Sequence, residues 1–214
     1  PSARGQGEPI STKFNLQPNE IITTVLTGAI EDHYLLASDM GFGFICRLAD
    51  MITRNKAGKA IVSLDENSNL LAPVKIEDVE HSLIVLISKK NRLLIYPASE
   101  LTVLPRGKGL KLMKISNAHL KQGLDGIAEL TSIQKGDGLI IYAGKRKIKL
   151  GEEIINERIS QRERQGESLP SSLPKVDYIE VIAKVAPTDA TTEASEASEV
   201  SAVASEAAAE ADAQ

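Results

Sequence analysis

The chain has 214 residues, 42% of them hydrophobic but only 3% aromatic, so a core is possible in at least part of it and must be built from Ile, Leu and Val. The net charge of −4 is uneven: residues 185–214 hold seven acids and no base, which leaves 22 of the 29 acids against all 25 bases in residues 1–184. A uniformly acidic protein is therefore excluded, and the basic body is expected to meet polyanions.

Short apolar runs between turn-forming residues predict closely spaced strands. Residues 1–18 are expected to complete a unit that begins upstream, since the chain lacks a starting Met and opens on Gly and Pro punctuation. Strands are then predicted at Ile21–Leu26, Tyr34–Ala37, Phe42–Cys46, Ala60–Leu64, Leu70–Val74, Leu83–Ile87, Leu93–Tyr96, Leu110–Ile115, Ile127–Thr131 and Leu139–Tyr142. These runs are too short and too frequent for a parallel α/β fold, so we predict an all-β fold.

The C-terminal third changes character. Gly151–Gly166 is predicted to be a helix, because acids lie at its start and arginines toward its end. Val176–Ile182 is predicted to be a last strand. Residues 185–214 have an Ala/Ser/Glu bias with nothing to pack, which predicts a disordered acidic tail.

The stretch Ala37–Leu64 recurs about fifty residues later, with Ala37 set against Ile87 and Gly58 against Gly109. A weaker third copy sets Tyr142–Leu150 against Ile87–Ile95. A period near fifty with several short strands per unit is typical of blades around an axis, because one unit cannot bury its apolar face alone. We expect the first blade to have an unpaired sheet edge, since its upstream neighbour is missing.

Residues that could carry catalysis or bind a metal are few. His33, His81 and His119 have no metal-ligand spacing, and Cys46 lies in an apolar strand run without a disulfide partner, which suits a reducing compartment. Residues 57–60 superficially resemble a phosphate loop but lack its first Gly and its magnesium-binding hydroxyl. Nothing in the sequence supports catalysis by this chain.

Basic residues recur at equivalent places in the repeat, and each cluster includes a glycine. The clusters are Arg54, Lys56 and Lys59; Arg106, Lys108 and Lys111; and Lys145, Arg146, Lys147 and Lys149. A Gly lets backbone amides approach an anion while Arg and Lys supply charge, as a phosphate-contacting loop requires. The alternative is a solvated face that keeps strand edges from aggregating. Recurrence at matched positions favours polyanion binding.

In a strand, Lys145, Lys147 and Lys149 share one face, and Ile148 and Leu150 take the other. Three like charges on one face repel each other unless an anion meets them. The residues at equivalent positions of the repeat vary in identity but keep their charge. Binding is therefore expected to follow the shape of the polyanion and to tolerate changes in its sequence.

Four stretches carry a resemblance to the C-terminal domain of topoisomerase IV A subunits, which with gyrase A form one bacterial family of type IIA topoisomerases. They are Ala37–Phe44, Thr53–Ala60, Arg106–Gly109 and Gly144–Leu150. The resemblance covers residues 1–182 and implies a β-pinwheel, a propeller-like disc of four-stranded blades that exchange strands. It implies that residues 1–184 form a partial pinwheel of about three blades plus the end of an upstream blade.

The same resemblance implies that the basic perimeter binds and bends duplex DNA. It further implies that, in the holoenzyme, the domain presents a transport DNA segment for ATP-dependent decatenation and supercoil relaxation in chromosome segregation. The gyrase box Gln-Arg-Arg-Gly-Gly-Lys-Gly is not reproduced here, which favours topoisomerase IV, although that box belongs to a first blade that can lie upstream. A gyrase A domain and a propeller-like protein-interaction module stay open as alternatives.

None of the four tyrosines follows the arginine that precedes the cleaving tyrosine of this family. The resemblance therefore implies a chain that is non-catalytic alone and holds no cofactor, within a parent that uses ATP and Mg²⁺ through its partner subunit. The implied partners are duplex DNA, the N-terminal cleavage domain that precedes this region in the same polypeptide, and the B subunit in an A2B2 holoenzyme. No membrane span is expected, and the implied location is cytoplasmic, at the nucleoid.

Overall fold

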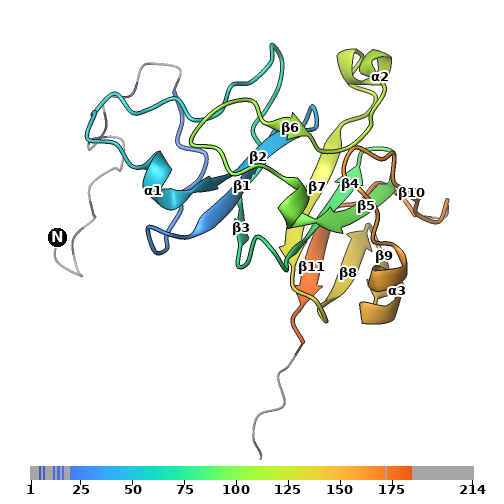
Figure 1. Cartoon of the computed structure of the whole chain (residues 1–214). Coiled ribbons are helices and arrows are strands. Elements are labelled where there is room, and N and C mark those ends of the chain that lie inside the picture. The colour runs from blue at the N-terminus through green and yellow to red at the C-terminus, as the bar shows by residue number, and fades with distance from the viewer. Residues whose placement is uncertain are drawn as a thin grey trace, which may run out of the picture. The chain divides into compact units, whose positions relative to one another are not determined.

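The computed structural model describes residues 5, 7, 12, 14, 16, 20–171 and 173–184. Predictions for the tail, and most of those for residues 1–18, lie outside the described residues. Pro1–Ala183 forms one compact unit, built mainly from strands (Figure 1). The strands are β1 (His33–Ala37), β2 (Phe42–Arg47), β3 (Val74–Ile76), β4 (Leu83–Ser88), β5 (Arg92–Pro97), β6 (Leu110–Lys111), β7 (Ile127–Ile133), β8 (Gly138–Ala143), β9 (Arg146–Leu150), β10 (Glu167–Ser168) and β11 (Tyr178–Ile182).

The helices are short. They are α1 (Leu48–Met51), η2 (Ala98–Glu100), α2 (Asn117–Lys121) and α3 (Glu152–Glu157). No helix within the described residues is long and apolar enough to cross a membrane. The prediction of an all-β fold is confirmed.

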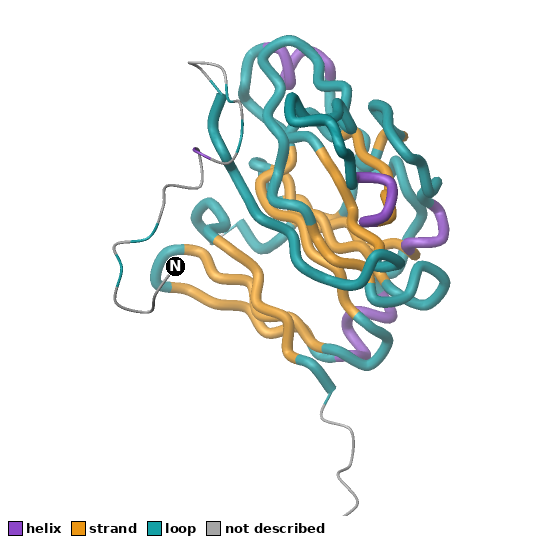
Figure 2. The backbone as a smooth tube through the Cα atoms, turned by 90° about the vertical axis from the view of Figure 1, so that its left-hand side faces the viewer, coloured by secondary structure: helices purple, strands orange, loops and turns teal. Residues whose placement is uncertain are grey.

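Three hairpins, β1–β2, β4–β5 and β8–β9, form the centres of three antiparallel sheets. The sheet orders are β3-β1-β2-β6 (blade 1), β10-β5-β4-β7 (blade 2) and β11-β8-β9 (blade 3). Figure 2 shows the strands in orange. In each blade the strand after the hairpin pairs with its first strand. The outermost strand instead comes from beyond the next hairpin: β6 pairs with β2, and β10 with β5.

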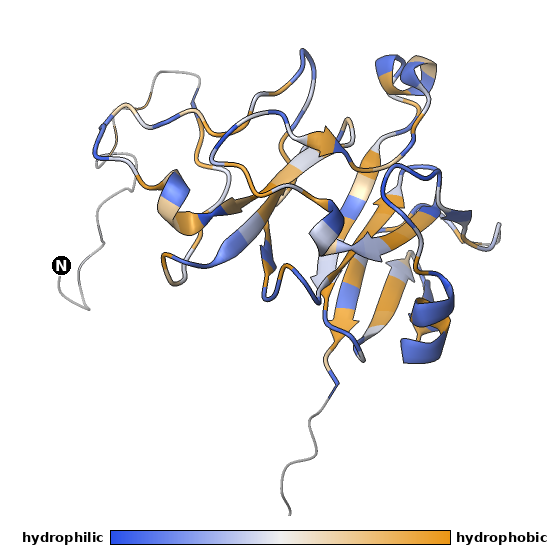
Figure 3. Cartoon of the chain, viewed as in Figure 1, coloured by the Kyte–Doolittle hydropathy of each residue, from blue (hydrophilic) through white to orange (hydrophobic). Residues whose placement is uncertain are grey.

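The blades stack face to face because their hairpin strands are apolar on both sides, as buried strands are. All six residues of β4 are buried. Leu86 and Leu94 pack against blade 1, while Ile87 and Ile95 pack against blade 3. The other face of blade 1, with Tyr34, Leu36, Phe44 and Cys46, is covered by loop residues such as Ile61 and Leu104. Figure 3 shows much apolar colour on the strands, whereas the connecting loops carry both hydrophilic and apolar colour.

The inner strands β3, β7 and β11 lie side by side, with β7 between the other two. They mark the hub, and β6 and β10 mark the opposite, outer ends of their sheets. We call the outer strands β6 and β10 with the turns that precede them, residues 105–111 and 162–168, the rim.

Several predicted strands are wrong, for one shared reason. Ile21–Leu26 is irregular, and Ala60–Leu64 has only the single bridge between Val62 and Gly107. By its place in the repeat, 60–64 corresponds to β6, which pairs with the hairpin of the preceding blade. No hairpin precedes β1 within the described residues, so this apolar run has no ladder to join and instead covers blade 1.

Three other boundaries shift. Leu70 forms only a bridge to Ser38, and the strand is β3, four residues further along. Leu110–Ile115 shortens to β6, and Val176–Ile182 begins only at Tyr178.

The predicted helix Gly151–Gly166 shrinks to α3, a correction with a tertiary cause. Beyond Glu157 the chain bonds to other blades: the Ser160 N–H donates to Ile95 O and the Glu163 N–H to Leu112 O, at 2.8 and 3.1 Å. Glu163 has a φ of 62°, which no α-helix contains. The charge pattern favours a helix here, but the hydrogen bonds with other blades hold this stretch in a non-helical path to the rim.

Blade 1, for which an unpaired sheet edge was expected, has four strands, because β6 arrives from beyond the second hairpin and fills its outer position. Blade 3 is the sheet that has three strands within the described residues: its second hairpin strand, β9, pairs only with β8.

Candidate nucleic-acid interface

The rim is built around two glycines that bring the outer strands against their blades. Gly109 and Gly166 have φ values of 79° and 74°. A Cβ on Gly109 would overlap the carbonyl of Gly43, and one on Gly166 would lie 2.6 Å from Leu93 O. Glycine is therefore required twice, by backbone conformation and by close approach to the second hairpin strand. Each is followed by a two-residue strand and a buried leucine, Leu112 or Leu169.

The first predicted cluster lies in an exposed irregular stretch between α1 and β3. Arg54, Lys56 and Lys59 are all exposed. Lys59 Nζ donates to Asp50 O at 2.6 Å, while no ion pair of Arg54 or Lys56 is found within the described part of the chain. Gly58 has a positive φ close to those of the rim glycines, 81°.

The second cluster is on the rim, but its three cations are not equivalent. Arg106 is exposed. Lys108 Nζ lies 2.8 Å from Asp65 Oδ2 and 4.0 Å from the centroid of the Phe42 ring. Its ammonium therefore already has an ion-pair partner and a cation–π contact. Lys111 is half-buried on β6, opposite Phe42.

The third cluster lies on the open edge strand of blade 3. Lys147 and Lys149 share the outer face of β9, as predicted, and Ile148 and Leu150 face the core. Lys145 lies in the turn with Gly144 rather than in the strand, so the predicted row of three lysines is a row of two. Arg146 is the exposed first residue of β9.

The register also corrects the alignment of the third copy. Ala143 pairs with Arg146, which leaves a two-residue turn, whereas Ile87 pairs with Leu93 across an odd-numbered loop. Ile148 therefore corresponds to Leu94, because both face the preceding blade.

By that register, Lys147 and Lys149 occupy the positions of Leu93 and Ile95 in blade 2, where both side chains are buried against blade 3. Positions that are apolar and stack against the next blade in blade 2 are therefore lysines in blade 3. Blade 3 thus has the polar outer face that a terminal repeat requires. The row of lysines faces outward from the end of the stack rather than outward from the rim.

Two tyrosines lie beside these lysines. Tyr142 and Tyr178 stack with ring centroids 4.4 Å apart, and Tyr142 Oη donates to Glu180 Oε2 at 2.7 Å. That hydrogen bond raises the pKa of Tyr142 to about 12. Tyr178 is 51% exposed, so this face offers an aromatic surface as well as charge.

The residues that occupy the third rim position were missed: Arg162 and Arg164, ahead of Gly166. The rim positions share a glycine followed three residues later by Ile or Leu, at Gly58, Gly109 and Gly166. The same spacing also occurs elsewhere, as at Gly107 and Gly136, so it could not have singled them out. Arg162 links the rim to neighbouring segments: its Nη1 donates to Lys111 O at 2.5 Å, and its backbone N–H donates to Glu100 Oε2 at 2.7 Å. Arg164 is exposed, with Nη2 2.9 Å from Gln161 Oε1.

Groups that could serve catalysis are scattered over the part of the chain that the structure describes. Within the described residues no cluster of His, Cys, Asp or Glu could hold a metal ion. Cys46 is buried, which raises its pKa above the ordinary thiol value, as expected of a core residue. His81 is exposed and pairs with Asp78 at 2.7 Å.

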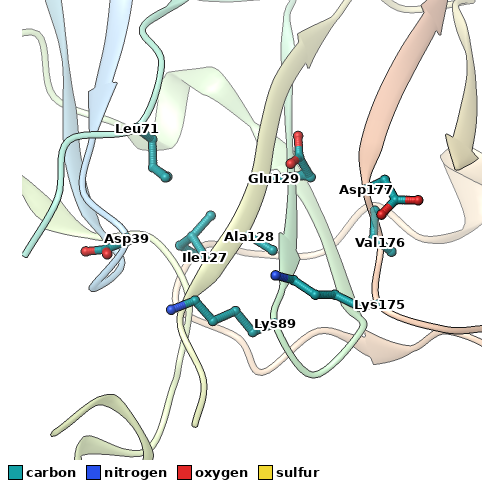
Figure 4. Close-up of a pocket in the computed structure, with 9 residues that line it drawn as sticks. All are labelled: Asp39, Leu71, Lys89, Ile127, Ala128, Glu129, Lys175, Val176 and Asp177. Atoms are coloured by element: carbon teal, nitrogen blue, oxygen red, sulfur yellow. The ribbon is translucent and has the colours of Figure 1, made fainter. Parts of the chain in front are cut away.

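A pocket of about 370 Å³ opens at the hub, where residues of all three blades meet (Figure 4). Asp39 comes from the β1–β2 turn, Glu129 from β7, and Lys175 and Asp177 precede β11. Burial and then Asp177 raise the pKa of Glu129, which Lys175 opposes. The lining mixes both signs of charge, so this pocket has no single ligand preference, and it lies away from the basic clusters.

Known proteins are similar to this chain in both sequence and fold. No protein-family profile matches it. The A subunit of DNA topoisomerase 4 from Escherichia coli K12 is 40% identical over 181 residues, which make up 85% of this chain and 24% of that protein. The chain thus spans about a quarter of the length of the curated relatives that it matches.

Two solved structures have the same fold. The C-terminal domain of E. coli ParC superposes with a TM-score of 0.78 at 38% identity, covering 86% of this chain and 74% of that one. The DNA gyrase A C-terminal domain superposes with a TM-score of 0.63 at 17% identity, covering 84% and 59%. The predicted β-pinwheel architecture is confirmed.

Proposed function

The chain belongs to the family of the C-terminal domains of DNA topoisomerase IV A subunits, and from that premise we propose that it binds duplex DNA and bends it around the basic side of the disc. The single observation that carries the proposal is the recurrence of exposed arginines, Arg54, Arg106 and Arg164, each shortly before a positive-φ glycine of the repeat. Arg106 and Arg164 precede the outer strands of blades 1 and 2, and Arg54 lies in the stretch that covers blade 1. Exposed cations repeated in this way suit a phosphate backbone, which is read by charge and spacing rather than by base.

At the level of the parent protein, we propose that this domain presents a transport segment for ATP-dependent decatenation and supercoil relaxation during chromosome segregation. Its partners would be the cleavage domain of the same polypeptide together with the B subunit, which would supply the ATP and Mg²⁺ sites. A cytoplasmic, nucleoid-associated location belongs to the same proposal.

Two alternatives differ in what supports them. A gyrase A domain shares the fold, but the much higher identity to topoisomerase IV subunits favours the latter. A protein-interaction module draws support from the exposed tyrosine stack on blade 3. In that case DNA binding would be weak and insensitive to salt.

The test is a gel-shift titration of the whole chain with duplex DNA at several salt concentrations. If bent DNA passes the first two clusters and Arg164 and roughly six phosphates are neutralised, the log–log salt slope is about −5. Arg54→Glu with Arg106→Glu should reduce the slope by about 2 and weaken binding to all sequences alike.

Lys121→Glu with Lys135→Glu is the matched control, because both lysines are exposed and the change in net charge is the same. Equal weakening by the two pairs would reduce the effect to net charge and sink the proposed path. Circular dichroism melts of both variants check that the fold is intact.

A further inference from the structure

A second basic feature lies at the turn end of blade 2, in a pocket of about 180 Å³. It is enclosed by the β4–β5 turn, the segment after β6, α2 and the residue before Gly166. Its lining residues are Ser88, Lys90, Arg92, Met113, Lys114, Ile115, Ser116, His119, Asp125 and Gln165. Four of these ten side chains are basic, and none of the four was singled out by the sequence repeat as part of a cluster.

The cations of this pocket are not matched by acids. No ion pair of Lys90, Arg92 or Lys114 is found among the described residues. The one carboxyl group in the lining, Asp125, is buried and accepts the Gly126 N–H at 2.9 Å. A concave site with several cations and one engaged acid holds a positive potential that an anion would relieve.

Two contacts arrange these groups before any ligand arrives. Lys90 Nζ lies 2.9 Å from His119 Nδ1, a contact in which the ammonium donates and the ring nitrogen accepts. Arg92 Nη1 donates to Gly166 O at 3.2 Å, which anchors its guanidinium to the rim. Prior fixing of long side chains lowers the entropic cost of binding.

The repeat itself does not require this charge. The residues of blade 1 that correspond to Lys90, Arg92 and Lys114 are Met40, Phe42 and Ser63. Blade 1 folds into the same four-stranded sheet without them. The cations are therefore additions at one place, not a consequence of how a blade packs.

We propose that this pocket binds a phosphate group, and that in the protein's function this is a backbone phosphodiester of the bent duplex. The inference rests on the proposed function, which it deepens by naming one fixed contact at the junction of β6 and β10. The Lys90 ammonium has hydrogens left after bonding to His119, Arg92 offers its remaining guanidinium donors, and Lys114 adds charge from the segment after β6. The contact would hold the register of the DNA between the exposed arginines of consecutive blades.

The first experiment measures binding of duplex DNA to the whole chain with Lys90→Ala and Lys114→Ala together. We leave Arg92 intact because it also contacts Gly166. The pair should weaken binding roughly tenfold at low salt and reduce the salt slope by about 2, uniformly across sequences. Lys121→Ala with Lys135→Ala is the control, since Lys121 lies on α2 beside His119 but outside the pocket.

The second experiment follows the ring resonances of His119 by NMR in the parent chain, with a short duplex in one arm and inorganic phosphate in the other. A shift with duplex that disappears in the double alanine variant supports the proposal. A shift with inorganic phosphate alone, combined with unchanged DNA affinity of the variant, assigns the pocket to a free phosphate and overturns the DNA contact.

No shift in either arm overturns the site altogether. Failure of the parent chain to bind duplex at all would instead sink the proposed function. The phosphate arm would then still report on the pocket by itself.

Discussion

At the scale of single residues, two glycines at equivalent positions of the repeat separate the cost of backbone strain from the cost of a steric clash. Gly58 and Gly109 have nearly the same positive φ, 81° and 79°. A Cβ on Gly58 meets nothing within 4 Å, whereas one on Gly109 overlaps the backbone of Gly43. The first site therefore isolates backbone strain, and the second adds a steric clash with β2.

We expect Gly58→Ala to destabilise the fold by about 1 kcal/mol, the cost of a left-handed conformation for an L-residue. That corresponds to a fall in Tm of roughly 2–4 °C for a chain of this size. Gly109→Ala should cost at least twice as much, measured by thermal denaturation side by side. Equal melting temperatures would mean that β6 yields easily and that the rim is not tightly held.

Glu129 provides a pH test at the hub. Burial raises the pKa of its carboxyl group, so the charged form is disfavoured in the folded state. Its contribution to stability is full below the ordinary Glu pKa and is lost as pH rises through the raised value. Glu129→Gln should therefore raise Tm at pH 7 and leave it nearly unchanged at pH 4. A lower Tm at pH 7 would show that attraction to Lys175 outweighs burial.

Residue reasoning recovered what one repeat contains by itself. Cys46 as a core residue and Lys147 and Lys149 on one strand face follow from alternation alone. Arg164 was missed because its glycine, Gly166, comes later than a period of about fifty predicts. The basic pocket was missed because Lys90 and Lys114 are brought together only by packing. Whether the predicted clusters contact DNA stays a prediction.

At the scale of elements, the hairpins were predictable and the outer strands were not. β1–β2 and β4–β5 each lie within one apolar stretch, so local pattern is enough. β6 and β10 have two residues each and depend on partners in another repeat. The run Ala60–Leu64 is the converse case: it has strand composition, but no described hairpin offers it an edge.

The outer face of blade 3 provides a test of what ends the stack. Lys147→Leu with Lys149→Ile restores the residues that blade 2 has at these positions. The change should create an apolar face beside Tyr142 and Tyr178 and cause concentration-dependent self-association at micromolar protein, detected by light scattering after gel filtration. The parent should remain at its original mass.

The same substitutions at Lys121 and Lys135 serve as the control, because those lysines lie on α2 and in the turn after β7. A double variant of blade 3 that elutes like the parent would show that the lysines do not end the stack. In that case the face of β9 is limited by its shape rather than by its charge.

At the scale of the whole chain, the uneven charge predicts competition. Residues 185–214, with seven acids and no bases, lie outside the described residues, but they are tethered to a basic body. A tethered polyanion acts at high effective concentration. Deleting residues 185–214 should therefore increase DNA affinity at low salt by a few-fold and have no effect at high salt, where the attraction is screened. Unchanged affinity at low salt would leave the tail without a role in binding.

The exchanged outer strands also set the order in which the molecule can be completed during synthesis. A ribosome releases the first hairpin long before residues 110–111, so blade 1 waits as a three-stranded sheet with its β2 edge open until the second hairpin has emerged. Blade 2 waits in the same way for residues 167–168. Blades 1 and 2 are each closed by a strand that follows the next hairpin, and nascent chains that stall between hairpins would expose an edge to which another nascent chain on the same messenger could pair.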